Sequence, residues 1–188
     1  RLSHTDRATG QVIRCERPTA GDLVHVDVKK FGLIPPGGGW RIHGRQDRTG
    51  NAGRVSQRRE DRRRRGSGRA GYAYVHSAVD DHTRLAYSEA PDDETTLTAA
   101  AFWQRAVAFF ASHDIPVAQV MTDNGAAYVS RHWRATLASL NISHIRTRPY
   151  RPQTNGKIER FHRTLRDEWG YGKAYRSASA RRNAFDQL

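Results

Sequence analysis

The chain contains a single cysteine, Cys15, among its 188 residues. One thiol excludes a disulfide within the chain and any zinc site that needs two thiolates. No apolar run approaches the about 20 residues that a membrane-spanning helix needs. The polar start RLSHTDRATG does not have the pattern of a signal peptide. From these absences we expect a reducing, cytoplasmic location.

Acidic residues are also scarce: 19 Asp and Glu stand against 32 Lys and Arg, which gives a formal net charge of +13. A basic balance of this size in a folded domain favours a polyphosphate partner. The alternatives are a solubility effect and an acidic membrane surface, but the sequence has no basic amphipathic helix or lipidation signal that would favour a membrane. The start at Arg1 indicates a piece of a longer protein.

Three segments without a pattern of buried residues flank or interrupt the expected domain. Residues 1–20 lack apolar periodicity and are expected to be a linker or arm. Residues 41–70 form an arginine-rich insertion, in which positions 54–69 hold eight arginines and two acids. This insertion could embrace a nucleic-acid backbone or be a solvated loop. Residues 170–188 are polar and are expected to be a truncated C-terminal tail, which leaves a core domain over residues 21–169.

Within this core, apolar spacing predicts the order strand, strand, strand, helix, strand, helix, strand, helix. Val24, Val26 and Val28 alternate with polar residues, which is a strand pattern. Such an order indicates a mixed α/β domain, with an antiparallel meander first and strands joined through helices afterwards. The expected elements are strands at 23–31, 116–123 and 142–150, a hairpin over 71–90, and helices at 95–113, after Ser130 and from Thr154.

Asp27 lies in the middle of a predicted strand, among valines, where an aspartate is disfavoured. Burial of a carboxylate there is costly unless a cation or hydrogen-bond donors compensate it. The residue is therefore a candidate metal ligand. The alternative is a structural salt bridge to Lys29 or Lys30.

Two further acids could meet Asp27 in such a fold. Asp123 ends a predicted strand in MTDNGAAY, a position where α/β sheets place working residues, although an ordinary turn aspartate is the alternative. Glu159 lies beside the apolar stripe of the last helix, with an ion pair to Arg163 one turn later as the alternative. Three converging carboxylates can hold two divalent cations about 4 Å apart, an arrangement that serves phosphoryl transfer. Mg²⁺ suits it because it prefers oxygen ligands.

Four stretches in order, HVDVKKFG, AVDDHTRLAY, TDNGAAY and RPYRPQTNGKIERFHRTL, resemble the retroviral integrase catalytic core as it occurs in bacterial insertion-sequence transposases. Thirty-five residues lie between Asp123 and Glu159, a spacing typical of the acidic triad of that superfamily. The resemblance, over roughly residues 20–170, implies an RNase H-like α/β fold with a mixed sheet and flanking helices. It implies that Asp27, Asp123 and Glu159 bind two Mg²⁺ or Mn²⁺ ions.

The resemblance also implies an activity and partners. The activity would be metal-dependent hydrolysis at DNA 3′ ends followed by strand transfer. The partners would be transposon ends, a target duplex and further copies of the chain on DNA, near a bacterial nucleoid. The implied DNA-contacting residues are Asn124, Asn155, Lys157, His162, Arg163 and Arg166. Lys157 could instead be solvated, and His162 could be packed in the core.

Asp80 and Asp81 also end a predicted strand and could compete with Asp27 as metal ligands. The sequence DDHT suits a hairpin turn in which these side chains cap local amides, and we favour that interpretation.

Two other functions stay open. An RNase H-type or junction nuclease would share the fold and the metals but would not use a DNA 3′-hydroxyl as nucleophile; NGKIERFH favours the integrase branch. A catalytically silent DNA-binding module is the third possibility, although all three acids are present. The sequence departs from the family in its long arginine-rich insertion and in lacking the helix-turn-helix region that such transposases use to recognise their ends.

Overall fold

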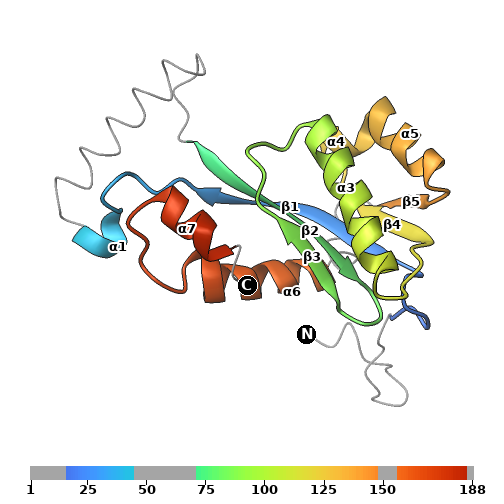
Figure 1. Cartoon of the computed structure of the whole chain (residues 1–188), viewed down its shortest axis with the longest axis horizontal. Helices are drawn as coiled ribbons and strands as arrows, with labels where there is room; N and C mark the ends of the chain where they lie inside the picture. The colour runs from blue at the N-terminus through green and yellow to red at the C-terminus, as the bar shows by residue number, and fades with distance from the viewer. Residues whose placement is uncertain (1–15, 45–70, 148–155, 186–188) are drawn as a thin grey trace, which may run out of the picture.

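The protein is represented by a computed structural model that describes residues 16–44, 71–147 and 156–185 (Figure 1). The arginine-rich positions 54–69 and Asn155 lie outside the described residues, so the predictions made for them are not addressed by the structure. Within the described ranges, no helix has both the length and the apolar character needed to cross a bilayer.

A five-stranded mixed sheet forms the centre of the fold. Its strands are β1 (Val24–Gly32), β2 (Tyr72–Asp80), β3 (Ala86–Glu89), β4 (Gln119–Thr122) and β5 (Ser143–Arg146). The spatial order is β3-β2-β1-β4-β5. β1 pairs antiparallel with β2 and β2 antiparallel with β3, whereas β4 runs parallel to both β1 and β5. The predicted combination of an antiparallel meander with parallel strands is therefore confirmed.

Helices cover the sheet. The helical elements of the described residues are α1 (Trp40–His43), α3 (Thr96–Ala111), α4 (Ala126–Val129), α5 (Arg131–Ser139), α6 (Gly156–Leu165), the π-helical segment η2 (Arg166–Gly170) and α7 (Ala178–Phe185). α5 begins as predicted, because the Ser130 hydroxyl accepts a hydrogen bond from the Trp133 amide at 3.1 Å. α1 and α4 were not predicted, since four residues are too few to show helical periodicity.

Alternate residues of β1 point into two different layers. Val24 and Val26 are buried in the larger core cluster, together with Trp103 of α3 and residues of α5. On the opposite face, the Phe31 ring meets Trp169 of η2 edge to face, with 5.2 Å between ring centroids. Figure 1 shows α3 to α5 on one side of the sheet and α6 with α7 on the other. The period-two pattern of β1 thus places His25, Asp27 and Lys29 on the side of α6.

The segment after residue 170 corrects the sequence-based expectation of a polar tail. Residues 178–185 form α7, and Tyr175 is buried in a second core cluster with Trp169. The Trp169 indole donates to the Arg181 carbonyl oxygen and the Tyr175 hydroxyl donates to the Trp169 carbonyl oxygen, both at 2.9 Å. This packing could not be predicted from apolar periodicity, because the buried face of α7 carries an arginine, Arg181.

Candidate active site

Asp27 lies on the face of β1 that is covered by α6. Its side chain is 24% exposed, and its Oδ2 lies 3.5 Å from Nδ1 of His162. Its Oδ1 accepts a hydrogen bond from the Val28 amide at 2.8 Å. Neither Lys29 nor Lys30 forms an ion pair with it within the described part of the chain, and Lys30 pairs with Glu94 instead. The structural salt bridge considered from the sequence is therefore not formed.

Asp123 follows β4, which pairs in parallel with β1. The ladder matches His25 with Met121, and two residues further along both chains this register sets Asp123 beside Asp27. The Asp123 Oδ1 accepts a hydrogen bond from the Gly125 amide at 2.8 Å, and its side chain is exposed. The residue is thus both a turn aspartate and a neighbour of Asp27.

Glu159 is exposed on α6, a helix that contacts β1 and β2. It forms no ion pair with Arg163 in the described part of the structure. The i,i+4 pair that would have explained this acid as a surface residue is absent there.

The three acids interact electrostatically. The pKa of Asp27 is raised to about 6, chiefly by burial and also by the negative charges of Asp123 and Glu159, against the opposing effects of the Val28 amide and Lys29. A carboxylate whose pKa is raised by burial and by neighbouring acids is what a metal site shows without its metal. The described residues contain no group of three His, Cys, Asp or Glu already close enough to hold a metal ion. The donor set fits Mg²⁺, but the carboxylates would have to approach one another to share it.

Asp80 behaves as the predicted turn residue. It is fully buried, and its carboxylate accepts hydrogen bonds from the Thr83 amide and hydroxyl at 2.7 Å each and from the Gly21 amide at 2.9 Å. Gly21 has a φ of +83°, and a Cβ there would lie 2.1 Å from the Pro116 carbonyl oxygen. The turn after β2 therefore requires the aspartate, and the loop before β1 that donates to it requires the glycine.

Asp81 is buried in a network of donors from three segments. Its Oδ1 lies 2.8 Å from Nε2 of His25 and 2.6 Å from Nζ of Lys157, and its Oδ2 accepts from the Arg17 amide at 2.7 Å. Burial alone would raise the pKa of Asp81, but the hydrogen bonds from Lys157, Arg17 and His25 outweigh it and the pKa is lowered. Asp81 is thus a paired structural carboxylate, and it holds Lys157, a predicted DNA contact, against the protein.

The other predicted DNA contacts have different environments. His162 is 3% exposed, so its burial against Asp27 does not fit a direct DNA contact, and this expectation is corrected. Arg163 and Arg166 are exposed on α6 and η2, and Arg166 pairs with Asp167 at 2.8 Å. Asn124 is exposed and its amide donates to the Thr147 carbonyl oxygen at 2.9 Å.

The sequence reasoning missed Tyr128. This residue of α4 is 4% exposed, and its hydroxyl has no hydrogen-bond partner within the described residues. Burial raises the pKa of Tyr128 well above its usual value, and the charges of Asp27 and Asp123 add to the effect. The hydroxyl is therefore close enough to the two aspartates for their charges to act on it. Its place five residues after Asp123, in TDNGAAY, is the signal that could have revealed it.

Comparison with known families defines the class of protein. The family described as integrase core domain matches residues 18–152, and a second family of the same description matches residues 140–188. The first match covers more than half of the chain. The chain therefore belongs to the integrase core domain family, as the four sequence stretches indicated.

Individual relatives are more distant. The Gag-Pro-Pol polyprotein of mouse mammary tumor virus (strain BR6) is 36% identical over 93 residues, which are 50% of this chain and 5% of the polyprotein. The chain thus spans only a small part of this relative.

Two solved structures have the same fold. One is the simian T-cell lymphotropic virus intasome in complex with PP2A regulatory subunit B56 gamma. It is 18% identical with a TM-score of 0.53, and the match covers 86% of this chain and 48% of that chain. The other is the HTLV-2 integrase catalytic core domain in complex with magnesium, in its dimeric form. It is 13% identical with a TM-score of 0.51, and the match covers 80% of this chain and 70% of that chain. These likenesses confirm the predicted RNase H-like α/β fold.

Proposed function

We propose that this chain is the catalytic domain of a DNA transposase or integrase, which hydrolyses DNA at 3′ ends and transfers the freed 3′-hydroxyl into a target strand. Family membership supports an integrase core. The observation that carries the chemistry is the placement of Asp123 and Glu159 close enough for their charges to act on Asp27, a partly buried carboxylate whose pKa is raised chiefly by burial. A bacterial mobile element as its source, and a place at the nucleoid, are part of the same proposal.

Asp27, Asp123 and Glu159 are the proposed ligands of two Mg²⁺ or Mn²⁺ ions. When bound, such ions lower the pKa of an attacking water or hydroxyl and stabilise the departing oxygen in an in-line displacement at phosphorus. The chain itself holds the carboxylates in place: the Val28 amide binds one oxygen of Asp27 and His162 lies against the other. Desolvation lowers the pKa of His162 to about 4, with a smaller effect from Lys29. The imidazole is therefore neutral at pH 7 and adds no positive charge that would oppose a metal.

DNA ends, target DNA and further copies of the chain are the proposed partners. The formal charge of +13 suits a polyanion. The solved neighbours support assembly and metal use, since one is a dimeric catalytic core in complex with magnesium and the other is an intasome. Asn124, Arg163 and Arg166 present exposed polar groups near the acids and remain the proposed DNA contacts within the described residues.

The proposal is tested with Asp27→Asn, Asp123→Asn and Glu159→Gln in a strand-transfer assay with Mg²⁺ or Mn²⁺, beside a DNA-binding assay. Each variant should lose strand transfer and keep DNA affinity, because a ligand is removed without a loss of positive charge. Glu168→Gln is the matched control, since Glu168 is an exposed acid on η2, beyond the end of α6. Strand transfer retained by any of the three acid variants would contradict the assignment.

The same assay separates the alternative functions. A nuclease of this fold would cut DNA but would not join a 3′-hydroxyl to a second strand. A silent module would bind DNA and do neither. The raised pKa of Asp27 speaks against a silent module, because a partly buried carboxylate that has no cationic partner and costs stability is typical of functional sites.

A further inference from the structure

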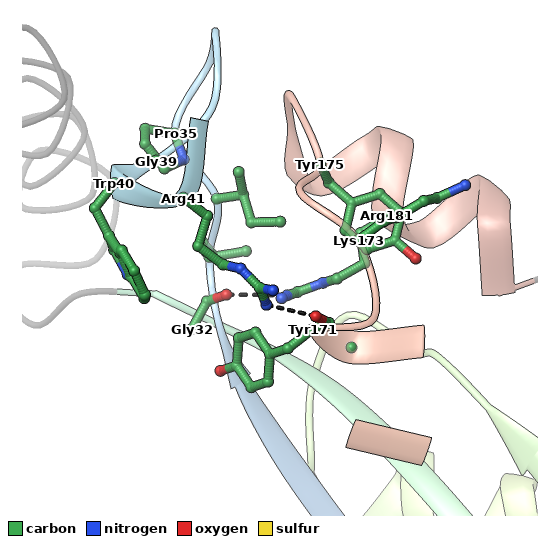
Figure 2. Close-up of a pocket in the computed structure, with 12 residues that line it drawn as sticks. Gly32, Pro35, Gly39, Trp40, Arg41, Tyr171, Lys173, Tyr175 and Arg181 are labelled. Carbon is green, nitrogen blue, oxygen red and sulfur yellow. Dashed lines mark hydrogen bonds between the residues drawn. The ribbon is translucent and has the colours of Figure 1, made fainter. Parts of the chain in front are cut away.

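A pocket lies at the end of β1 that is far from the acids (Figure 2). It is bounded by Gly32 at the end of β1, by α1, by the segment after η2 and by α7. Its volume is about 180 Å³, less than the roughly 300–1,000 Å³ of pockets that enclose drug-sized ligands. We call it the basic–aromatic pocket, and its principal lining residues are Arg41, Tyr171, Lys173, Tyr175 and Arg181.

Arg181 is a buried cation without a counter-ion. Its side chain is 1% exposed and lies over the rings of Phe31 and Trp169, at 5.4 and 5.7 Å from their centroids. Its Nη2 donates to the Gly32 carbonyl oxygen at 3.0 Å, but its Nη1 has no hydrogen-bond partner among the residues that the structure describes. No carboxylate of the described residues pairs with it, and burial lowers its pKa. Such a group is costly unless an anion compensates it.

Two more cations reach the pocket from other segments. Figure 2 shows the guanidinium groups of Arg41 and Arg181 extending toward the same part of the pocket, between Gly32 and Tyr171. Arg41 donates to the Tyr171 carbonyl oxygen, and Lys173 lies over the Tyr175 ring at 5.4 Å. Guanidinium forks are well suited to phosphate oxygens. The small volume fits a phosphate group and part of its sugar, and the 43% exposed ring of Tyr171 offers a stacking surface for a base outside.

A stripe of α6 and η2 connects the acids with this pocket. Glu159, Arg163, Arg166 and Gly170 are spaced by four, three and four residues, so they follow one face of the helix. Gly170 lines the pocket. Eleven residues of helix correspond to about 16 Å. On β1, which runs alongside, the five residues from Asp27 to Gly32 also span about 17 Å.

We propose that the basic–aromatic pocket binds a backbone phosphate of the DNA strand, about five nucleotides from the reacting phosphate for a strand that keeps the stacked helical rise of about 3.4 Å per nucleotide. Arg181, Arg41 and Lys173 are the anion-binding groups. The five-nucleotide distance rests on the proposed function of the acids, whereas phosphate binding in the pocket does not.

The test uses the full chain in EDTA, so that chemistry plays no part. Fluorescence anisotropy is measured with single-stranded oligonucleotides of increasing length and at several salt concentrations. The pocket variant is Arg41→Ala with Lys173→Ala, and the matched control is Arg131→Ala with Arg134→Ala, which removes two exposed arginines from α5. The pocket variant should weaken binding of oligonucleotides long enough to span the two sites. Its slope of log affinity against log salt should fall by about 0.7, the value for one lost phosphate contact on a single strand.

Equal losses in the two double variants, with unchanged thermal midpoints, would overturn the proposal, because only overall charge would then matter. Inorganic phosphate and dTMP serve as competitors. The proposal would also be overturned if inorganic phosphate binds in the pocket but the pocket variant binds oligonucleotides as tightly as the wild type does. The ligand of the pocket would then be a free anion. Strand transfer is measured in parallel with Mg²⁺. A chain that shows pocket-dependent affinity but no chemistry would refute the proposed function and leave the pocket standing.

Discussion

Asp27 and Asp81 are two buried or half-buried aspartates that the same helix, α6, covers. The Asp81 carboxylate pairs with Lys157 and His25 and accepts a hydrogen bond from the Arg17 amide, and its pKa is lowered. The Asp27 carboxylate accepts a hydrogen bond from one backbone amide and lies against the neutral imidazole of His162. It also lies near two other acids, and its pKa is raised to about 6, chiefly by burial. The difference shows that donors turn a buried carboxylate into a structural anchor, whereas missing donors leave it able to bind a cation.

The largest expected difference between the two sites is in catalysis. Asp27→Asn should lower strand transfer at least about 1000-fold, since a lost metal ligand removes several kcal/mol and each 1.36 kcal/mol is tenfold. Asp81→Asn should lower it only about tenfold, because it loosens Lys157 and so the start of the helix that carries Glu159. Rates are measured below the unfolding temperature of both variants. Equal losses would mean that the two aspartates do not differ in role.

The order should reverse for stability. Asp81→Ala should lower the free energy of unfolding by about 3 kcal/mol, because removal of one partner strands the buried charge of Lys157, and that side chain is only 21% exposed. Asp92→Ala is the control, since Asp92 pairs with Arg182 at an exposed site. Urea denaturation at pH 7 measures both variants. A loss at Asp81 no larger than at Asp92 would show that the buried network does not stabilise the fold.

Asp27 should make stability depend on pH in the opposite direction to Asp81. The folded pKa of about 6 lies above the unfolded value of 3.8, so the folded state holds its proton more tightly. Its destabilising effect should appear as pH rises from about 4 through 6 and reach about 1 to 3 kcal/mol at pH 7. Without metal, Asp27→Asn should therefore be more stable than the wild type at pH 7, with the difference vanishing near pH 4. Denaturation curves of both proteins across this range give the difference, and a constant one would contradict the raised pKa.

Divalent metal gives the smallest expected effect. Mn²⁺ at ten times its dissociation constant should stabilise the wild type and Asp81→Asn by about 1.4 kcal/mol through mass action on the folded state. Asp27→Asn and Asp123→Asn should show little of this gain. Thermal unfolding with and without Mn²⁺ is the measurement, with Ca²⁺-free buffer throughout. If Mn²⁺ stabilised Asp27→Asn as much as the wild type, the metal would have to bind at another site.

Periodicity was enough to predict most of the sheet and the three long helices. β1 and α5 begin within one residue of the predicted positions because valine alternation and the Ser130 cap are local signals. α7 was missed because Arg181 is buried where the pattern called for an apolar residue. Asp80 was correctly assigned to the hairpin turn, since its partner Thr83 is only three residues away.

By itself, the sequence determined the succession of strands and helices along the chain, the family and the identity of the three candidate acids, because these depend on spacing along the chain. Only the tertiary structure decided that the charge of Asp81 is compensated by partners and that the charge of Asp27 is not. The partners of Asp81 come from positions 56, 64 and 76 residues away, and His162 reaches Asp27 only when α6 packs on β1. Charge compensation between distant segments is a property of packing, and no local pattern records it.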